Sequence, residues 1–286
     1  MRILFIGDIV GRPGRELLRK GLRRLTEHFG VEFVIANVEN AAAGFGITKD
    51  IGDSIAELGV DVMTSGNHIW DKKEAIDYIP TEPRLLRPAN YPAGVPGRGA
   101  YVAQSGDGRA VGVINAMGRV FMLSIDDPFQ VVLREIEAMR SRTRIIVVDF
   151  HAEATSEKIA MGWHLDGKVT LVVGTHTHVQ TADERILPNG TGYLTDAGMT
   201  GPHDSIIGME REPALARFLN GMPSRFEPAT GNPRLNGVVV DADDKTGRAL
   251  AIRRISYSEQ ELLLLEPGVV KHLHDRASEP AGRVER

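Results

Sequence analysis

The sequence predicts an α/β protein in which two mixed β-sheets pack face to face and carry helices on their outer sides. In the first third of the chain, short apolar segments alternate with amphipathic helical segments, which indicates parallel β-α-β units. Later segments pair as hairpins, which indicates antiparallel additions to the sheets. Two packed sheets fit this mixture best, although the periodicity alone is also compatible with a single sheet.

The first eighty residues contain three predicted strands separated by helices. Leucines at helical spacing give the first helix an apolar face, and Gly30 is its expected stop. Asp71 and Glu74 form a D-x-x-E pattern, which predicts the start of a further helix. In chain order, the expected elements are a strand at 2–8, a helix at 14–30, a strand at 32–40, a helix at 48–58 and a strand at 60–68.

After about residue 80, proline and glycine interrupt the chain more often and the rhythm changes. Turn sequences at 105–108 and 244–247 each lie between two apolar segments, which predicts two hairpins. The expected elements here are hairpins at 100–118 and 236–256, a helix at 129–139, strands at 143–153 and 168–178, and a short strand within 189–208.

The composition limits the chemistry. The chain has 286 residues, a net charge of −4 and no cysteine. This length suits one domain, which we expect over residues 1–275, with a small subregion around 80–130 and a frayed tail at 276–286. The absence of cysteine excludes disulfides, thiolate metal sites and cysteine nucleophiles. A bound metal must therefore use imidazole, carboxylate, amide or water ligands.

The charge and the apolar segments also limit location and partners. The small acidic surplus argues against stable nucleic-acid binding, but small anionic substrates stay open. The first apolar segment ends at Gly7, too early for a signal peptide, and no window approaches a membrane span. We therefore expect a cytoplasmic protein without membrane contact, and a homo-oligomer is compatible with the sequence.

Polar residues stand at the ends of five predicted strands. They are Asp8, Glu39 with Asn40, Asn67 with His68, His151, and His176 with His178. Because ligands bind at the carboxyl ends of strands in α/β sheets, we expect these side chains to converge on one site. Each alone has a plain structural explanation, such as a helix cap, a turn or a buried histidine, but the shared position favours function.

Imidazole and carboxylate groups together suit Zn, Mn, Fe or Co. His176 and His178 face the same side if the chain between them is extended, and they then reach one ion or two adjacent ions. Glu39 has two carboxylate oxygens and can bridge two ions. A pair of ions about 3.5–4 Å apart is the usual arrangement for displacement at phosphorus.

The order of these motifs resembles that of the calcineurin-like metallophosphoesterases. The resemblance is carried by Asp8 in "GDIVGR", by "GNH" at 66–68, by His151 and by "GTHTH" at 174–178. It implies a four-layer α/β/β/α sandwich with a dinuclear metal site at the strand ends. Two positions depart from the superfamily pattern. Val10 stands where D-x-H has histidine, and "VEN" at 38–40 stands where G-D-x-x-D is usual.

With "MRILFIGDIVGRPGR", "NVENAA" and "GNHIWD", the chain is similar over essentially its whole length to the bacterial YmdB-type phosphodiesterases. That family is associated with hydrolysis of 2′,3′-cyclic nucleotides and related phosphodiesters. The resemblance therefore implies a dinuclear metal-dependent phosphodiesterase that acts on a small phosphodiester or nucleotide. Hydroxide generated at the metals attacks phosphorus, and His68 is the proton donor.

The resemblance also implies a set of metal ligands, with Glu39 as the bridge. The remaining ligands are Asp8, Asn40 and His178 at site one, and Asn67, His151 and His176 at site two. Asn40 takes the place of the missing D-x-H imidazole. Site one then has three oxygen donors and one nitrogen, which favours Fe or Mn over Zn.

Three further residues have two interpretations each. Arg12 contacts phosphate or forms a salt bridge on the first helix, and His203 lines the pocket or lies on a solvated loop. Asp71 is expected to cap a helix rather than to support His68. Two other functions also stay open: a phosphomonoesterase or 5′-nucleotidase with the same site, and a metal-stabilised regulatory or scaffold protein with little turnover.

Overall fold

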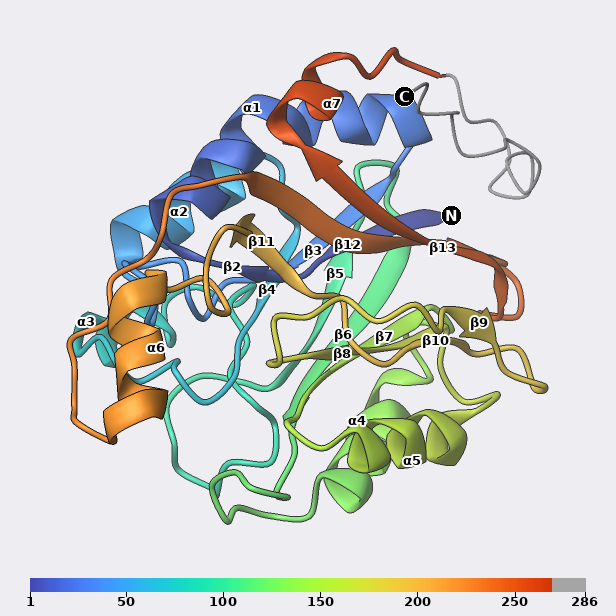
Figure 1. Ribbon diagram of the computed structural model, residues 1–286. Coiled ribbons are helices and arrows are strands. Elements are labelled where there is room, and N and C mark those ends of the chain that lie inside the picture. Colours follow the sequence, from blue (N-terminus) through green and yellow to red (C-terminus); the bar gives the residue numbers. More distant parts are fainter. Residues whose placement is uncertain (269–286) are drawn as a thin grey trace.

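Two β-sheets pack face to face in the computed structural model, which describes residues 1–268 (Figure 1). In spatial order, the first sheet contains β2 (Asp8–Ile9), β11 (Met199–Pro202), β12 (Pro233–Ala242), β1 (Arg2–Ile6), β3 (Phe33–Asn37) and β4 (Val62–Thr64), and β13 (Ala249–Ser258) pairs with β12. The second contains β5 (Ala100–Gln104), β6 (Ala110–Met117), β7 (Ile146–His151), β8 (Leu171–Thr175), β10 (Gly192–Leu194) and β9 (Arg185–Ile186). The two-sheet prediction is confirmed, and the predicted tail at 276–286 lies outside the described residues.

The inner faces of the two sheets share one hydrophobic core. Strand alternation sends Ile3 and Phe5 of β1 into this core, while Leu4 and Ile6 face the opposite side of the sheet. Val147 of β7 enters the same core from the second sheet. Because both faces of the central strands are buried, these strands are continuous apolar segments rather than alternating ones.

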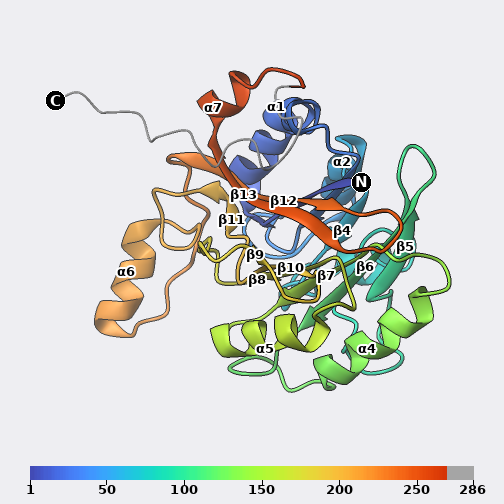
Figure 2. The ribbon, with the colours of Figure 1, turned by 90° about the vertical axis from the view of Figure 1, so that its right-hand side faces the viewer.

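Helices cover both outer faces of the sandwich (Figures 1 and 2). The first sheet is covered by α1 (Gly11–Phe29), α2 (Lys49–Glu57), α3 (Glu74–Tyr78) and α7 (Glu259–Leu263), and the second by α4 (Pro128–Met139) and α5 (Thr155–Leu165). Both views show α6 (Arg211–Asn220) at one edge of the molecule. This arrangement confirms the four-layer α/β/β/α sandwich.

Most predicted elements are present, with shifts of a few residues at their ends. Helix α1 ends at Phe29, where Gly30 has φ 64° and forms the expected left-handed cap. A further helix does follow the D-x-x-E pattern, since α3 begins at Glu74. The capping role of Asp71 is wrong, because the N-cap is Lys73 and the Asp71 side chain contacts a histidine instead. The helices α5, α6 and α7 were not among the predicted elements.

Some sequence predictions stay predictions. Residues 80–130 contribute β5, β6 and the start of α4 to the second half of the sandwich, and the proposed domain limits of 1–275 are not tested by this arrangement. Within residues 1–268, every helix is too short or too polar to span a bilayer. The cytoplasmic location is likewise a prediction.

Candidate metal centre

The strand ends of both sheets meet at one site. His151 is the last residue of β7, and Glu39 lies two residues beyond β3. Although they come from different sheets, His151 Nε2 and Glu39 Oε1 are 3.1 Å apart. Each of the seven residues expected to bind metal has a contact or a buried oxygen in this region. They are Asp8, Glu39, Asn40, Asn67, His151, His176 and His178.

Three atoms with lone pairs surround Nε2 of His151. Its Nε2 lies 3.0 Å from Asn67 Oδ1, 3.0 Å from His176 Nδ1 and 3.1 Å from Glu39 Oε1. One proton on Nε2 cannot satisfy all three neighbours, whereas a cation accepts lone pairs from every one of them. The geometry therefore fits residues that share one ion, and Glu39, His151 and His176 lie close enough to do so.

Each histidine is oriented by a partner on its other ring nitrogen. His151 Nδ1 lies 2.9 Å from Thr175 Oγ1, whose own proton goes to Asp149. His178 Nδ1 donates to the carbonyl of Ile207 at 2.8 Å. These bonds place the free lone pair on Nε2 of both rings.

His176 has the opposite tautomer. Its Nε2 lies 3.1 Å from Glu153 Oε2, so Nδ1 is the nitrogen that carries the free lone pair. Nδ1 is also the atom that faces His151. Burial and the neighbouring charge on His151 lower the pKa of His176 to about 3, which keeps the ring neutral.

Two buried oxygens in the site have no hydrogen-bond partner. They are Oδ1 of Asp8 and Oδ1 of Asn40, and both side chains are almost completely buried. Asn40 Nδ2 donates to the carbonyl of Gly44 at 2.9 Å, so the amide is held with its oxygen free. Asp8 Oδ1 also lies 4.0 Å from His178 Nε2. Because an unpaired buried oxygen is costly, both atoms are candidate ligands for a cation.

The ionisation of the site shows that it attracts positive charge. Burial raises the pKa of Asp8 well above its ordinary value, and the nearby carboxylate of Glu39 adds to this effect. Burial alone would lower the pKa of His151, but the charges of Glu39 and Asp8 outweigh it and hold that pKa at about 9. A proton on His151 therefore supplies charge that a metal would otherwise provide, and metal binding releases such protons.

The chain between His176 and His178 is not extended, which corrects the sequence interpretation. Strand β8 ends at Thr175, and the two histidines have φ values of 97° and 65°. Both residues are therefore in the left-handed half of backbone space, so their directions do not follow strand alternation. The turn is held by Asp196, which accepts hydrogen bonds from the amide and hydroxyl of Thr177.

His68 lies beside the proposed ligands. Its backbone N–H donates to Glu39 Oε2 at 3.2 Å, and its Nδ1 lies 2.8 Å from Asp71 Oδ2. The ring packs edge-on against Phe45, with centroids 5.2 Å apart. The expectation that Asp71 only caps a helix is therefore wrong, because it orients His68. Gly66 lets His151 and Glu39 lie close to the backbone of this turn, since a Cβ there would lie 2.2 Å from the His151 ring and 2.4 Å from Glu39 Oε2.

A cavity of about 610 Å³ opens onto this site. It is lined by Glu39, Asn40, His68, His176 and His178, among others. Its size is within the range of small-molecule sites.

Arg12 and His203 are not among the residues that line this cavity. Arg12 is exposed at the start of α1 and forms no salt bridge with residues 1–268, and its contact with phosphate stays a prediction. His203 lies in a neighbouring cavity that shares His178 and Ile207 with the first, and its Nδ1 is 3.0 Å from the Gly201 carbonyl. His203 therefore lines this neighbouring cavity and does not line the cavity at the proposed metal ligands.

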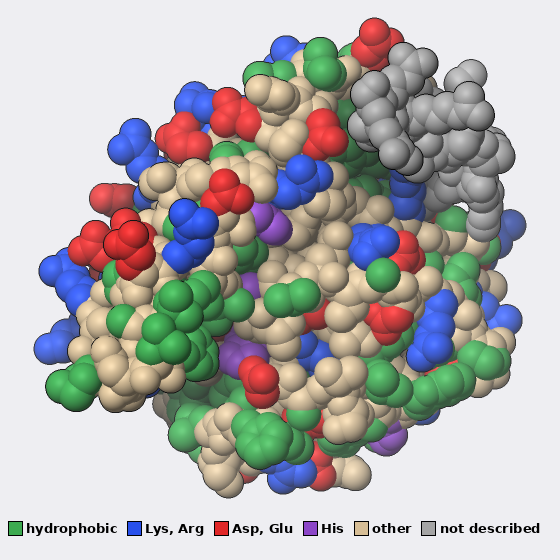
Figure 3. Space-filling model, in the orientation of Figure 1, with side chains coloured by type: hydrophobic (Ala, Val, Ile, Leu, Met, Phe, Trp, Pro, Cys, Tyr) green, Lys and Arg blue, Asp and Glu red, His purple; other side chains and the backbone are tan. Residues whose placement is uncertain are grey.

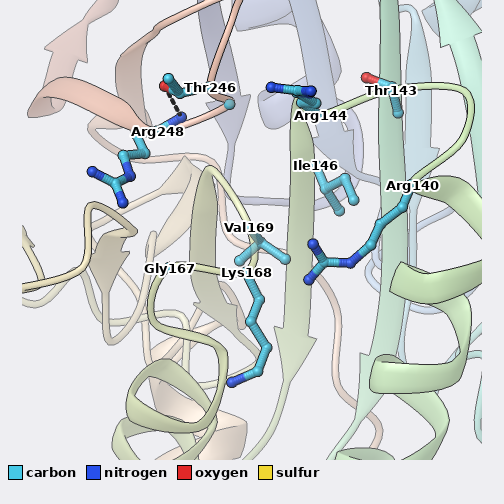
Figure 4. A pocket seen from close by; sticks show the side chains of 10 residues that line it. Arg140, Thr143, Arg144, Ile146, Gly167, Lys168, Val169, Thr246 and Arg248 are labelled. Atoms are coloured by element: carbon cyan, nitrogen blue, oxygen red, sulfur yellow. Dashed lines mark hydrogen bonds between the residues drawn. The ribbon is translucent and has the colours of Figure 1, made fainter.

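Figure 4 shows a different cavity, of about 330 Å³, at the opposite ends of β7 and β8. The side chains of Arg140, Arg144, Lys168 and Arg248 surround it. Arg140 caps the C-terminus of α4, and Lys168 Nζ donates to the His164 carbonyl near the end of α5. Cations stabilise helix C-termini, which accounts for part of this cluster. With no carboxylate or imidazole in its lining, this cavity does not have the ligands of a transition-metal site.

The sequence analysis missed three supports of the site: Asp149, Glu153 and Thr175. Glu153 follows His151 by two residues, so its proximity was a usable signal. Asp149 and Thr175 lie within apolar strand segments, where polar residues without water need partners. Such buried polar residues at strand ends could have been read as supports of a ligand set.

Known proteins are similar to this chain along most of its length. A family model described as YmdB-like protein matches residues 4–255. A 2′,3′-cyclic-nucleotide 2′-phosphodiesterase of Bacillus subtilis (strain 168) is 50% identical over 262 residues, which is 92% of this chain and 99% of that protein. A putative phosphatase/phosphodiesterase of Mycoplasma pneumoniae is 34% identical over 91% of this chain and 94% of that protein.

Two solved structures share the fold. A hypothetical protein from Thermus thermophilus has a TM-score of 0.83 and 42% identity, and the match covers 90% of this chain and 99% of that one. A phosphatase from Mycoplasma pneumoniae has a TM-score of 0.83 and 33% identity, over 90% and 93% of the two chains.

Proposed function

The chain belongs to the YmdB-like family, and from this premise we propose that it is a dinuclear metal-dependent phosphodiesterase that hydrolyses 2′,3′-cyclic nucleotides. The assignment as an enzyme that hydrolyses phosphoesters is supported by the phosphodiesterase of Bacillus subtilis, which is 50% identical to this chain. One observation carries the proposal. Three histidine side chains, which can bind metal when neutral, lie in the same region as the carboxylate of Glu39 and two unpaired buried oxygens.

The ligand set divides into two groups. In this proposal Asn67, His151 and His176 would hold one ion, and Asp8, Asn40 and His178 would hold the other, with Glu39 shared. The short contacts of His151 with Asn67 and His176, and the unpaired oxygens of Asp8 and Asn40, support the proposal. When bound, the two ions would lower the pKa of a coordinated water and screen the charge on the phosphoryl oxygens. Only Asp8 and Glu39 among these seven ligands are carboxylates. Two divalent cations would therefore leave the site positive and attractive to a diester monoanion.

His68 is the proton donor in this proposal. Its Nδ1 is held by Asp71, which leaves Nε2 as the nitrogen that can pass a proton to the leaving oxygen. The edge-on contact with Phe45 restricts the ring further. An alkoxide is a poor leaving group, so a proton delivered to it in the transition state lowers the barrier.

A panel of phosphoesters tests the reaction. We expect metal-loaded protein to hydrolyse 2′,3′-cyclic AMP faster than a linear diester or 5′-AMP. A preference for 5′-AMP would favour a phosphomonoesterase or 5′-nucleotidase. If metal-loaded protein hydrolyses none of the three, the regulatory or scaffold interpretation replaces the enzymatic one.

Elemental analysis tests the metals. The Asp8, Glu39 and Asn40 oxygens make site one harder than a purely imidazole site, and we propose Fe or Mn in preference to Zn. Protein purified without added metal should contain mainly Fe or Mn. Two Zn per chain with full activity would contradict this preference.

A further inference from the structure

Apolar side chains form part of the lining of the site cavity, and we call this part the apolar wall. The apolar wall consists of Phe45, Ile207, Met209, Ala214, Phe218 and Phe226. Figure 3 shows hydrophobic side chains gathered near α6, next to histidine side chains on the same face. Phe45 packs against His68, and the Ile207 carbonyl orients His178, but the side chains of Met209, Ala214, Phe218 and Phe226 take no part in metal coordination or proton transfer. Their chemistry therefore bears on what else the substrate carries.

Part of the apolar wall is fixed and part is free. Phe45 and Phe226 pack against the small core formed by Val10, Met199 and Met209. The Arg217 guanidinium lies over the Phe226 ring, 5.5 Å from its centroid. Phe218, in contrast, is 81% exposed.

Helix α6 is weakly buried for a helix that lines a substrate cavity. Ala214 is its one buried residue, although Phe218 also lines the cavity. Exposed aromatic area beside a polar site costs free energy until a ligand covers it. A flat apolar group on the substrate would cover Phe218 while the phosphate stays at the ligands.

We propose that the apolar wall binds the nucleobase of the substrate by stacking, with Phe218 as the principal contact and Phe226 behind it. This inference rests on the proposed function, and it adds a determinant of substrate class. The enzyme selects cyclic phosphodiesters that carry a base over those that do not.

The same wall does not read the identity of the base. Its members are apolar, and base identity is read by hydrogen bonds to base edges. Stacking is tolerant because every base has a π-face. Cyclic nucleotides with all four bases should therefore have KM values within about tenfold of one another, with purines favoured by their larger area.

The test compares two substrates with the same reacting ring. 2′,3′-cyclic AMP and glycerol 1,2-cyclic phosphate share a five-membered cyclic diester, but the second has no base. In the metal-loaded full-length enzyme, Phe218→Ala should raise KM for 2′,3′-cyclic AMP about 5- to 100-fold, the range expected for one base–aromatic stack. KM for glycerol cyclic phosphate and kcat for both substrates should change less than about twofold.

Leu219→Ala is the matched control, because Leu219 is 77% exposed on the same helix but does not line the cavity. It should leave both KM values unchanged. Phe218→Trp should preserve the nucleotide KM, since its ring also stacks. Equal effects of Phe218→Ala on both substrates, or none, would overturn the proposal. So would a change in oligomeric state, measured by light scattering, without a selective change in KM.

This result is separable from the proposed function itself. If the wild-type enzyme hydrolyses neither cyclic diester, the proposed function fails. If it hydrolyses both with the same kcat/KM, the function stands and the apolar wall has no role in selection.

Discussion

The carboxylate of Glu153 lies 3.1 Å from Nε2 of His176, on the side of the ring that faces away from His151. Glu153 comes from the segment after β7, and His176 comes from the segment after β8. The contact therefore ties two neighbouring strand ends together. Since it places a hydrogen on Nε2, it leaves the Nδ1 lone pair for a metal.

Removal of Glu153 should weaken metal binding at site two. Glu153→Ala loses the partner that orients His176, and such losses cost about 10–100-fold in metal affinity. Glu153→Gln keeps an acceptor oxygen and should lose less. Metal affinity is measured by titration of apo protein with Mn²⁺ in a calorimeter.

The control for this experiment is Glu137→Ala, since Glu137 is an exposed glutamate on α4. It should bind Mn²⁺ with the affinity of the wild type. An unchanged affinity in Glu153→Ala would show that the contact with His176 does not orient the ring.

Substitution of His68 should affect substrates according to their leaving groups. Without the proton donor, hydrolysis of 2′,3′-cyclic AMP should fall about 10²–10⁴-fold, because the alkoxide leaves without a proton. An aryl phosphate with a good leaving group should lose less than about tenfold for the same reason. The measurement is kcat for His68→Ala on both substrates.

Asp71→Asn is the companion variant, because it keeps the size of the side chain and weakens the hold on His68 Nδ1. It should show the same dependence on leaving group with a smaller loss. Equal losses on both substrates in His68→Ala would argue for a structural role of the ring instead.

The sequence predicted the two sheets and the convergence of the polar residues because both depend on local patterns. Apolar periodicity marks a strand, and a polar residue at its end is visible one position later. The backbone at His176 and His178 could not be predicted, since its left-handed φ values depend on Asp196 and on the neighbouring chain. The orientation of Asp71 was also missed, because Asp71 can either cap the following helix or pair with His68 three residues before it, and the D-x-x-E pattern favours the first.

The apolar wall was missed for a related reason. Helix α6 carries Phe218 and Leu219 on exposed surface, so it lacks the periodic burial that identifies a helix from sequence. Ala214 and Phe218 of α6 join the other residues of the apolar wall only in the folded chain.

The buried ion pair of Lys158 and Asp196 supports the turn that carries the site histidines. Nζ lies 2.6 Å from Oδ2, and both side chains are at most 2% exposed. Lys158→Met should leave the Asp196 charge buried without its partner and lower the free energy of unfolding by about 3–5 kcal/mol. Urea unfolding of the two proteins measures the difference.

The second variant is Lys158→Met with Asp196→Asn, which removes the unpaired charge and should recover part of the loss. Lys49→Met breaks an exposed pair with Asp53 and should leave the urea midpoint nearly unchanged. If Lys158→Met were as mild as Lys49→Met, the buried pair would not hold the turn.

Arg109 joins the two sheets at the end of the sandwich opposite the site, and this link should depend on pH. Its guanidinium contacts Glu32 before β3, Asp107 in the β5–β6 turn and Asp244 in the β12–β13 turn. The hydrogen bond from Arg109 holds the pKa of Asp107 well below its ordinary value. A carboxyl with a lowered pKa in the folded protein adds stability above its unfolded pKa of about 4, and this stability is lost as pH falls below that value.

Arg109→Gln should therefore lower Tm by a few degrees at pH 7. The difference from wild type should shrink as pH falls from 4 to 2, because Asp107 then becomes protonated in the unfolded chain, and this removes the advantage of the paired carboxylate in the folded wild type. High salt should reduce the difference at pH 7 as well, since these groups are exposed. Arg142→Gln is the control, because Arg142 is an exposed arginine on the loop after α4. Circular dichroism melting at each pH gives the comparison, and a difference that stays constant down to pH 2 would show that Arg109 acts through packing rather than through charge.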